Sequence, residues 1–353
     1  MTEIINKLFK GSPVSDDELA YIISGEYNDS LLFEKADAVR QKVYGKEVFI
    51  RGLVEISSYC KNNCYYCGIR AGNKDAERYR LTSAEIFSCC RNGYELGFRT
   101  FVLQGGEDDA FSDDIICSLV SRIKSEFPEC AVTLSLGEKS YESFAAYRKA
   151  GADRYLLRHE TADEAHYRML HPASMDLSHR KQCLFDLKKL GFQTGAGFMV
   201  GSPFQTVREL VSDIRFLEEL KPEMIGIGPF IHHSQTPFAD RPDGSVSVTL
   251  RLLSVLRLMF PEVLLPATTA MGTLSGDGRE RALKAGANVV MPNLSPVGVR
   301  KKYSLYENKI CTGEEAAECL NCLKNRIRVA GYEMSFSRGD HKNYNRGATD
   351  VKI

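Results

Sequence analysis

Three cysteines spaced Cys-x3-Cys-x2-Cys, at Cys60, Cys64 and Cys67, are the residues of this 353-residue chain best suited to chemistry. Thiolates are the ligands that iron–sulfur clusters need, and three of them on one tight loop can hold three irons of a cubane. The fourth iron then has no nearby protein ligand, which is the open coordination that a catalytic metal site requires. The spacing therefore predicts a 4Fe-4S cluster with one iron available to a small molecule.

A structural zinc site is the alternative for this loop. Zinc prefers four ligands, usually from Cys-x2-Cys pairs, and no fourth Cys or His lies close by in the sequence. Tyr66 before the third cysteine and Gly68 after it match the radical S-adenosylmethionine (SAM) signature, in which an aromatic residue precedes the last ligand. In proteins with that signature the methionyl group of SAM chelates the open iron, and an electron from the cluster releases a 5′-deoxyadenosyl radical.

Composition limits the possible partners and the compartment. Lys plus Arg and Asp plus Glu both number 46, so the net charge is zero and gives no reason to expect nucleic acid or an anionic membrane. No signal peptide or membrane-spanning stretch is recognisable, so we expect a cytoplasmic protein. Eleven cysteines are many for a reducing compartment and point to metal or redox chemistry.

Eight short β-branched runs alternate with amphipathic helical stretches along the chain. Strands that alternate with helices predict a parallel sheet, and eight such units predict a closed (β/α)8 TIM barrel. An open doubly wound sheet is the alternative, but no GxGxxG motif follows an early strand. The runs are 47–57, 99–105, 130–137, 153–159, 193–201, 223–230, 263–269 and 288–293.

The helical stretches carry the expected start and stop signals. Thr82 and Glu85 form a capping-box pattern, and glycines follow several of the helices where a left-handed residue is expected. We predict helices over 82–96, 112–126, 140–150, 177–190, 205–220, 246–260, 278–285 and 313–330.

The runs and helices predict three segments along the chain. Residues 1–46 would form a helical preamble outside the barrel, 47–302 the barrel itself, and 303–353 a C-terminal extension. In such barrels chemistry gathers where the strands end. The ends of these runs are rich in polar residues and glycine, as in Gln104–Glu107 and Arg158–Glu160.

With the cysteine loop, the later motifs identify a family: from about residue 46 to 325 the chain closely resembles HydE, the radical SAM maturases of FeFe-hydrogenases. The resemblance rests on the segments CYYCGIRAGN, RYRLTSAEI, VLQGGED, TLSLGE, GADRYLLRHET, TGAGFMVGSPFQT, GIGPFIHH, PATTAMGT and ANVVMPN.

The resemblance implies residue roles at the matching positions. A first set would hold SAM: Tyr66, Gly105, Gly106, Glu107, Ser135, Glu160 and Arg180. A second set would line the substrate cavity deeper in the barrel: Gln104, Thr133, Arg158, Thr268, Thr269 and Met291. Arg158 is there a fixed cation suited to an anionic substrate. Thr133 and Thr268 could instead be barrel-filling residues, Met291 a core residue, and Arg180 a cation on a helix surface.

A second group of cysteines, Cys311, Cys319 and Cys322, follows the last run. Some members of the family carry an accessory 2Fe-2S or 4Fe-4S cluster with this spacing, and others lack it. Three cysteines are one ligand short, so an exogenous ligand or partial occupancy is expected; the alternative is that they are unused buried thiols. The remaining five cysteines fall in helical or strand patterns and are expected in the core.

The resemblance implies an enzyme that acts on a small iron–carbonyl–cyanide–cysteine precursor of the hydrogenase diiron site. It also implies an electron donor such as ferredoxin or flavodoxin, and other hydrogenase maturases as partners. Two enzymatic alternatives are a methylornithine-synthase-like mutase that acts on an amino acid and a biotin-synthase-like enzyme. A non-catalytic iron–sulfur scaffold would need no SAM site, so Glu107, Ser135, Glu160 and Arg180 argue against it.

Overall fold

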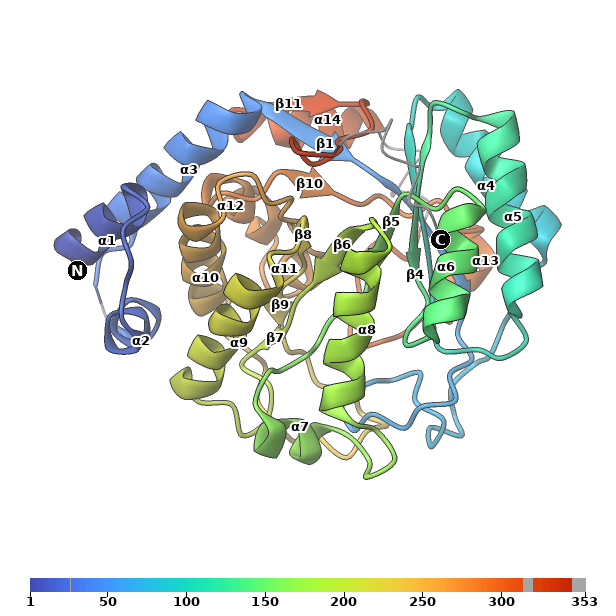
Figure 1. Cartoon of the computed structure of the whole chain (residues 1–353), viewed down its shortest axis with the longest axis horizontal. Helices are drawn as coiled ribbons and strands as arrows, with labels where there is room; N and C mark the ends of the chain where they lie inside the picture. The colour runs from blue at the N-terminus through green and yellow to red at the C-terminus, as the bar shows by residue number, and fades with distance from the viewer. Residues whose placement is uncertain (26, 314–319, 345–353) are drawn as a thin grey trace.

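The computed structural model describes residues 1–25, 27–313 and 320–344 (Figure 1). Its centre is a parallel sheet with one strand from each of the first six predicted runs. Each strand is hydrogen-bonded to the next one in chain order. The strands are β2 (Gly52–Ser57), β3 (Thr100–Gly105), β4 (Ala131–Ser135), β5 (Arg154–Leu156), β6 (Gln193–Ala196) and β8 (Met224–Ile225).

The last two runs close this sheet into a barrel. Met224 bridges Leu264, Pro266 bridges Val289, and β10 (Val289–Val290) pairs with β1 (Glu47–Ile50), all in parallel. Because β1 and β2 belong to one run, the first and last runs meet and the predicted eight-membered closure is confirmed. The run at 263–269 contributes only bridges and no regular strand, because Pro266 has no N–H for a ladder.

Two of the runs are interrupted at the mouth of the barrel. The fifth divides into β6 and β7 (Met199–Val200), and the sixth into β8 and β9 (Gly228–Pro229), so that β7 and β9 pair by themselves. Gly197 lies at the first break with φ of 153°, and a Cβ there would lie 2.0 Å from the Gly226 carbonyl oxygen. Only glycine fits this close approach of two backbones.

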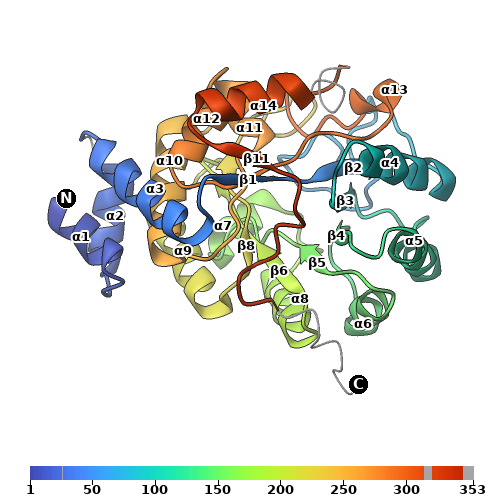
Figure 2. The same cartoon turned by 90° about the horizontal axis from the view of Figure 1, so that it is seen from above.

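Helices surround the barrel as predicted (Figure 2). Thr82 and Glu85 form the expected capping box, and the glycines at 97, 151, 191 and 286 have positive φ. Sequence patterns did not reveal the short helices α7 (Glu164–Leu170), α11 (Thr269–Leu274) and α13 (Val297–Arg300). The predicted helices are α4 (Ser83–Glu95), α5 (Asp113–Glu126), α6 (Tyr141–Lys149), α8 (Leu177–Lys189), α9 (Val207–Leu220), α10 (Val246–Met259), α12 (Gly278–Lys284) and, in the described part of its range, α14 (Leu320–Val329).

The N-terminal segment forms three helices outside the barrel: α1 (Thr2–Phe9), α2 (Asp16–Ser24) and α3 (Ser30–Tyr44). They lie together at one side in Figure 2, with α3 against α10 and α2 against α9. No helix in the described ranges is long and apolar enough to cross a membrane.

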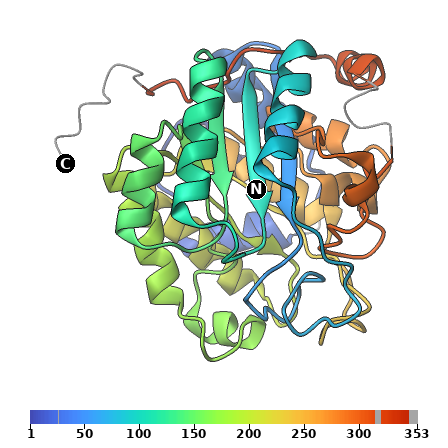
Figure 3. The ribbon, with the colours of Figure 1, turned by 90° about the vertical axis from the view of Figure 1, so that its right-hand side faces the viewer.

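The C-terminal segment adds a strand that the sequence analysis did not predict. β11 (Glu333–Ser335) pairs in parallel with β1, and residues 338–341 then cross the end of the barrel where the strands begin. Arg154 at the start of β5 forms an ion pair with Asp340, and Arg338 forms one with Asp153 over 2.8 Å. In Figure 3 this red segment crosses one end of the barrel, and the blue loop after β2 lies at the other.

Buried charges hold this segment in place. Burial alone would raise the pKa of the Asp340 carboxyl, but the Arg154 and Arg338 guanidinium groups hold it well below its ordinary value. The Arg154 side chain is fully buried, so removing its carboxylate partner would leave an uncompensated charge.

We predict that Asp340→Asn lowers the free energy of unfolding by about 3 kcal/mol at neutral pH, because the Arg154 guanidinium loses its charged partner. The folded-state pKa of Asp340 is depressed, so its stabilisation is present above the unfolded pKa, near 4, and is lost as pH falls further. Urea unfolding should give a constant difference from the parent protein between pH 5 and 7 that shrinks below about pH 4. The exposed-carboxylate variant Asp240→Asn is the control, and an equal effect of both variants would contradict the prediction.

Candidate active site

The three cysteines of the first motif lie on the loop after β2, at the carboxyl end of the barrel strands. Burial raises the pKa of all three thiols, that of Cys64 to about 12, and the charges of the neighbouring cysteines raise those of Cys64 and Cys67 further. The thiols are thus close enough to interact electrostatically and are protonated without a metal. A cationic iron–sulfur core would replace those protons, so the three side chains fit such a cluster.

The cysteine loop is held by Arg78, a residue to which the sequence analysis gave no role. The Arg78 guanidinium donates hydrogen bonds to the carbonyl oxygens of Ser58, Ile69, Arg70 and Asn73. These four acceptors lie on both sides of the three cysteines. Arg78 therefore fixes the two ends of the loop relative to each other, and its only sequence signal is its place at the start of a quoted motif.

Tyr66, which precedes the third cysteine, is oriented by His171. Nδ1 of His171 lies 3.0 Å from the Tyr167 carbonyl oxygen and must donate to it, so Nε2 accepts from the Tyr66 hydroxyl over 3.1 Å. Burial lowers the pKa of His171 to about 3, so the ring stays neutral at physiological pH. Sequence patterns gave no signal for His171.

The glycine-rich turn after β3 contacts the cysteine loop directly. A Cβ on Gly106 would lie 2.2 Å from the Tyr59 carbonyl oxygen and 2.7 Å from the Cβ of Cys60. Gly106 therefore lets the two loops touch. Next to it Glu107 is buried, accepts from the Glu138 amide over 2.9 Å, and has its pKa raised by burial. A buried carboxylate in this state would gain from an ammonium group placed against it.

Arg180 extends from α8 to the ends of two strands. Its Nε donates to the Arg158 carbonyl oxygen over 2.7 Å, and its Nη1 forms an ion pair with Glu138. The residue is 8% exposed, which excludes the interpretation of Arg180 as a cation on a helix surface. Ser135, the last residue of β4, lies beside Gln104 in the sheet and is half-buried.

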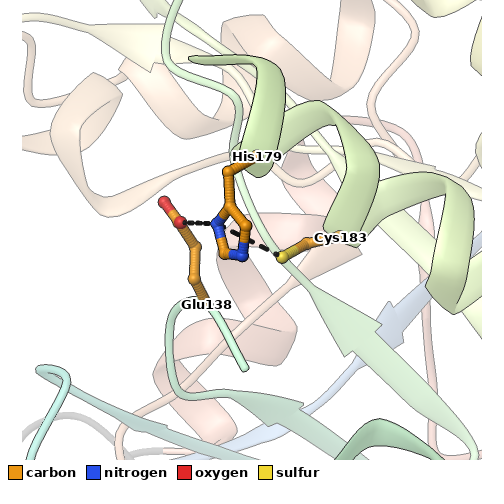
Figure 4. A group of neighbouring side chains, drawn as sticks. All are labelled: Glu138, His179 and Cys183. Carbon is orange, nitrogen blue, oxygen red and sulfur yellow. Dashed lines mark hydrogen bonds and ion pairs between the residues drawn. The ribbon is translucent and has the colours of Figure 1, made fainter. Parts of the chain in front are cut away.

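Glu138 is a third residue that the sequence analysis missed, although it ends a quoted motif. Its other oxygen lies 2.7 Å from Nδ1 of His179, and Cys183 Sγ lies 4.0 Å from the same nitrogen (Figure 4). The ligand atoms of these three residues lie within 4.8 Å of one another. The Cys183 thiol donates to the Lys139 carbonyl oxygen, and Arg180 shares the carboxylate, so we assign the group to holding Arg180.

Arg158 and Glu160 face each other at the end of β5. Nη2 of Arg158 lies 3.0 Å from Oε2 of Glu160, and the two side chains are 31% and 11% exposed. Glu160 has φ of 67°, a left-handed conformation that costs roughly 1–3 kcal/mol for such a residue. In this arrangement Arg158 braces Glu160. Its buried Nε has no hydrogen-bond partner among the described residues and could still meet an anion.

Two threonine hydroxyls of the substrate set are buried without a hydrogen-bond partner in the described part of the chain: those of Thr133 and Thr268. A residue that only fills a barrel would not leave its hydroxyl unsatisfied at a cost of roughly 1–3 kcal/mol. Gln104 donates to the Tyr303 hydroxyl over 3.3 Å. Met291 packs beside apolar core residues, which favours the packing interpretation, and Thr269 begins α11.

The second group of cysteines is described only in part. Cys311 is half-buried, and its sulfur accepts from Arg279 over 3.7 Å. Cys322 is exposed on α14, and Cys319 lies outside the described residues. The accessory cluster thus remains a prediction.

Comparison with known proteins places this geometry in context. A family model described as the Radical SAM superfamily matches residues 54–217. The [FeFe] hydrogenase maturase subunit HydE of Thermotoga maritima is 45% identical over 316 residues, which is 90% of each chain. A 3-methylornithine synthase of Methanosarcina barkeri is 28% identical over 92% of each chain. The crystal structure of methylornithine synthase (PylB) superposes with a TM-score of 0.82 at 28% identity, covering 94% of this chain and 97% of that one.

We predict that Arg78→Met makes a reconstituted cluster leave the protein roughly tenfold faster in the presence of an iron chelator, because the two ends of the loop lose a shared charged donor. Lys74→Met in the same loop is the matched control, since the Lys74 ammonium makes one hydrogen bond of 3.5 Å. Equal rates of iron loss from the two variants would contradict the role given to Arg78.

Proposed function

The chain belongs to the HydE family of [FeFe] hydrogenase maturases within the radical SAM superfamily, and from this we propose that it acts on a small iron–carbonyl–cyanide–cysteine precursor of the hydrogenase diiron site. One observation carries the proposal: three interacting thiols, buried carboxylates and two arginines gather at one mouth of a closed barrel.

We assign the cofactors to residues whose surroundings fit them. Cys60, Cys64 and Cys67 would hold the 4Fe-4S cluster, which when bound supplies the electron for reductive cleavage of SAM. Glu107 would accept a hydrogen bond from the methionyl ammonium of SAM. Arg180 would donate to the methionyl carboxylate of SAM; if it keeps its ion pair with Glu138 instead, it would shape the site without touching SAM. Tyr66, Gly105, Gly106, Ser135 and Glu160 complete this set.

The substrate would lie deeper in the barrel, against Arg158 and the hydroxyls of Thr133 and Thr268. These groups offer a cation and two hydroxyls that have no hydrogen-bond partner among the described residues, which suits an anionic ligand with several acceptors. Gln104, Thr269 and Met291 are assigned to the same region by resemblance. Residues 338–341 cover the opposite end of the barrel, which supports a reaction kept away from water.

A methylornithine-synthase-like mutase is the second candidate, because a 3-methylornithine synthase matches nearly the whole chain. The higher identity to HydE favours the maturase. The two differ in substrate, so incubation with lysine or with the iron precursor, followed by mass spectrometry, separates them.

The proposed partners follow from the pathway. We propose a ferredoxin or flavodoxin as electron donor and other hydrogenase maturases as sources and recipients of the substrate and product. Cys311, Cys319 and Cys322 would hold the accessory cluster.

We predict that replacing Cys60, Cys64 and Cys67 with Ala abolishes formation of 5′-deoxyadenosine and methionine from SAM in the presence of dithionite. The triple variant Cys89→Ala, Cys117→Ala, Cys130→Ala is the matched control and should keep this cleavage. Undiminished cleavage in the first variant would refute the assignment of the catalytic cluster.

We predict that Arg158→Met preserves the fold and lowers substrate-dependent turnover roughly ten- to a hundredfold, the effect of one lost charge-assisted contact of about 1.5–3 kcal/mol. Both SAM affinity and the apparent substrate constant should be measured on this variant. If SAM affinity falls while the substrate constant is unchanged, Arg158 only braces Glu160, and its substrate role is refuted.

A further inference from the structure

The backbone of Glu160 is held in a conformation that glutamate rarely adopts. Its φ of 67° lies in the left-handed region, where non-glycine residues persist only when their surroundings fix them. The Glu160 amide donates to the Gly197 carbonyl oxygen over 3.1 Å, and its carbonyl oxygen accepts from the Met199 amide over 3.3 Å. These two bonds attach Glu160 to the neighbouring run of the barrel.

His159, the residue before Glu160, is fully buried and has a defined tautomer. Its Nδ1 accepts from the Gly197 amide over 3.3 Å, so the ring proton lies on Nε2. Nε2 is 3.3 Å from Oδ1 of Asp213 on α9. The rings of Phe198 and Phe216 pack against the imidazole and leave it little freedom to turn.

Asp213 contacts both sides of Glu160 with one oxygen. The same Oδ1 that faces His159 accepts from the Ala162 amide over 2.5 Å. A fully buried carboxylate is costly unless polar contacts compensate for its lost hydration. The reaction assigned above to the mouth of the barrel gives Asp213 no direct part.

Helix α8 contacts both ends of the segment 158–162, which contains Glu160. Arg180 donates to the Arg158 carbonyl oxygen over 2.7 Å, and the next residue, Lys181, donates to the Ala162 carbonyl oxygen over 2.9 Å. Residues 158 and 162 are therefore bound to α8, and residues 159 and 162 contact Asp213. Glu160 lies between these points, and its side chain faces Arg158.

We propose that His159 and Asp213 are positioning residues that fix Glu160 in its left-handed conformation and so preset the carboxylate for SAM. This inference rests on the proposed function, in which Glu160 contacts SAM. Neither His159 nor Asp213 touches SAM; both act through the backbone on either side of Glu160.

The test uses holoprotein reconstituted anaerobically and measures the dissociation constant of SAM. His159→Phe keeps an aromatic ring and loses both polar contacts. Asp213→Ala removes the oxygen that accepts from the Ala162 amide and faces His159, and Asp213→Asn restores an oxygen in its place. His159→Phe and Asp213→Ala should each raise the SAM dissociation constant about tenfold. The SAM dissociation constant of Asp213→Asn should stay within about threefold of that of the parent protein.

Two controls separate positioning from a general loss of stability. Leu217 is fully buried on α9, the helix that carries Asp213. Leu217→Ala should destabilise the fold and change SAM affinity less than about twofold. In a Glu160→Gln background, His159→Phe should have little further effect, because the contact that it positions is already lost. Hydrogen exchange at the Gly197 and Ala162 amides, measured without SAM, should accelerate in His159→Phe and Asp213→Ala respectively.

The outcomes are distinguishable. If Glu160→Gln alone leaves SAM affinity unchanged, the role of Glu160 in the proposed function fails, and the inference built on it is overturned too. If Glu160→Gln weakens binding but His159→Phe and Asp213→Ala do not, or if their effects add fully to that of Glu160→Gln, only the positioning role is overturned. Equal losses in Asp213→Asn and Asp213→Ala would also contradict it. If His159→Phe fails to fold, the comparison between the two Asp213 variants decides.

Discussion

The site depends on the pairing of one run, residues 47–57, with neighbours on both edges. Its first half pairs with β10 and its second half with β3, and this double pairing closes the barrel. In a closed parallel barrel all strands end at one mouth. The cysteine loop, the turn at Gly106, and the segment around Glu160 therefore meet there although they are far apart in the sequence.

The mouth of the barrel brings together buried ionisable and polar side chains. The three thiols have raised pKa values, and the Glu107 carboxyl is buried with a raised pKa as well. The hydroxyls of Thr133 and Thr268 have no hydrogen-bond partner among the described residues. Burying such groups costs free energy, and contacts with a metal, an ammonium or an anion would offset that cost.

Local and periodic features of the fold could be predicted from the sequence, and long-range contacts could not. The capping box at Thr82, the glycines that end helices and the eight runs each leave a pattern within a few residues. β11 pairs with β1, which lies near the other end of the sequence, and no pattern in residues 333–335 predicts this pairing. The run at 263–269 forms no regular strand, because Pro266 in its middle cannot donate a backbone hydrogen bond.

The same division holds for the site. The cysteines carry a diagnostic spacing, and the motifs around Glu107 and Glu160 carry a family resemblance. Arg78, Glu138 and His171 act through specific hydrogen bonds and ion pairs with backbone or side chains elsewhere in the chain, and such contacts leave no periodic signal. Asp213 lies in an amphipathic helix, and an aspartate in such a helix is expected to face solvent. In the structure it is fully buried.

The central claim is that the three-cysteine cluster leaves one iron open to SAM. Electron–nuclear double resonance of the reduced holoprotein with SAM labelled at its amino nitrogen and carboxylate oxygen tests this most directly. The account predicts hyperfine coupling from both labels to the cluster, with loss of the amino coupling in Glu107→Ala. A reduced cluster that shows no coupling to either label at saturating SAM would contradict it.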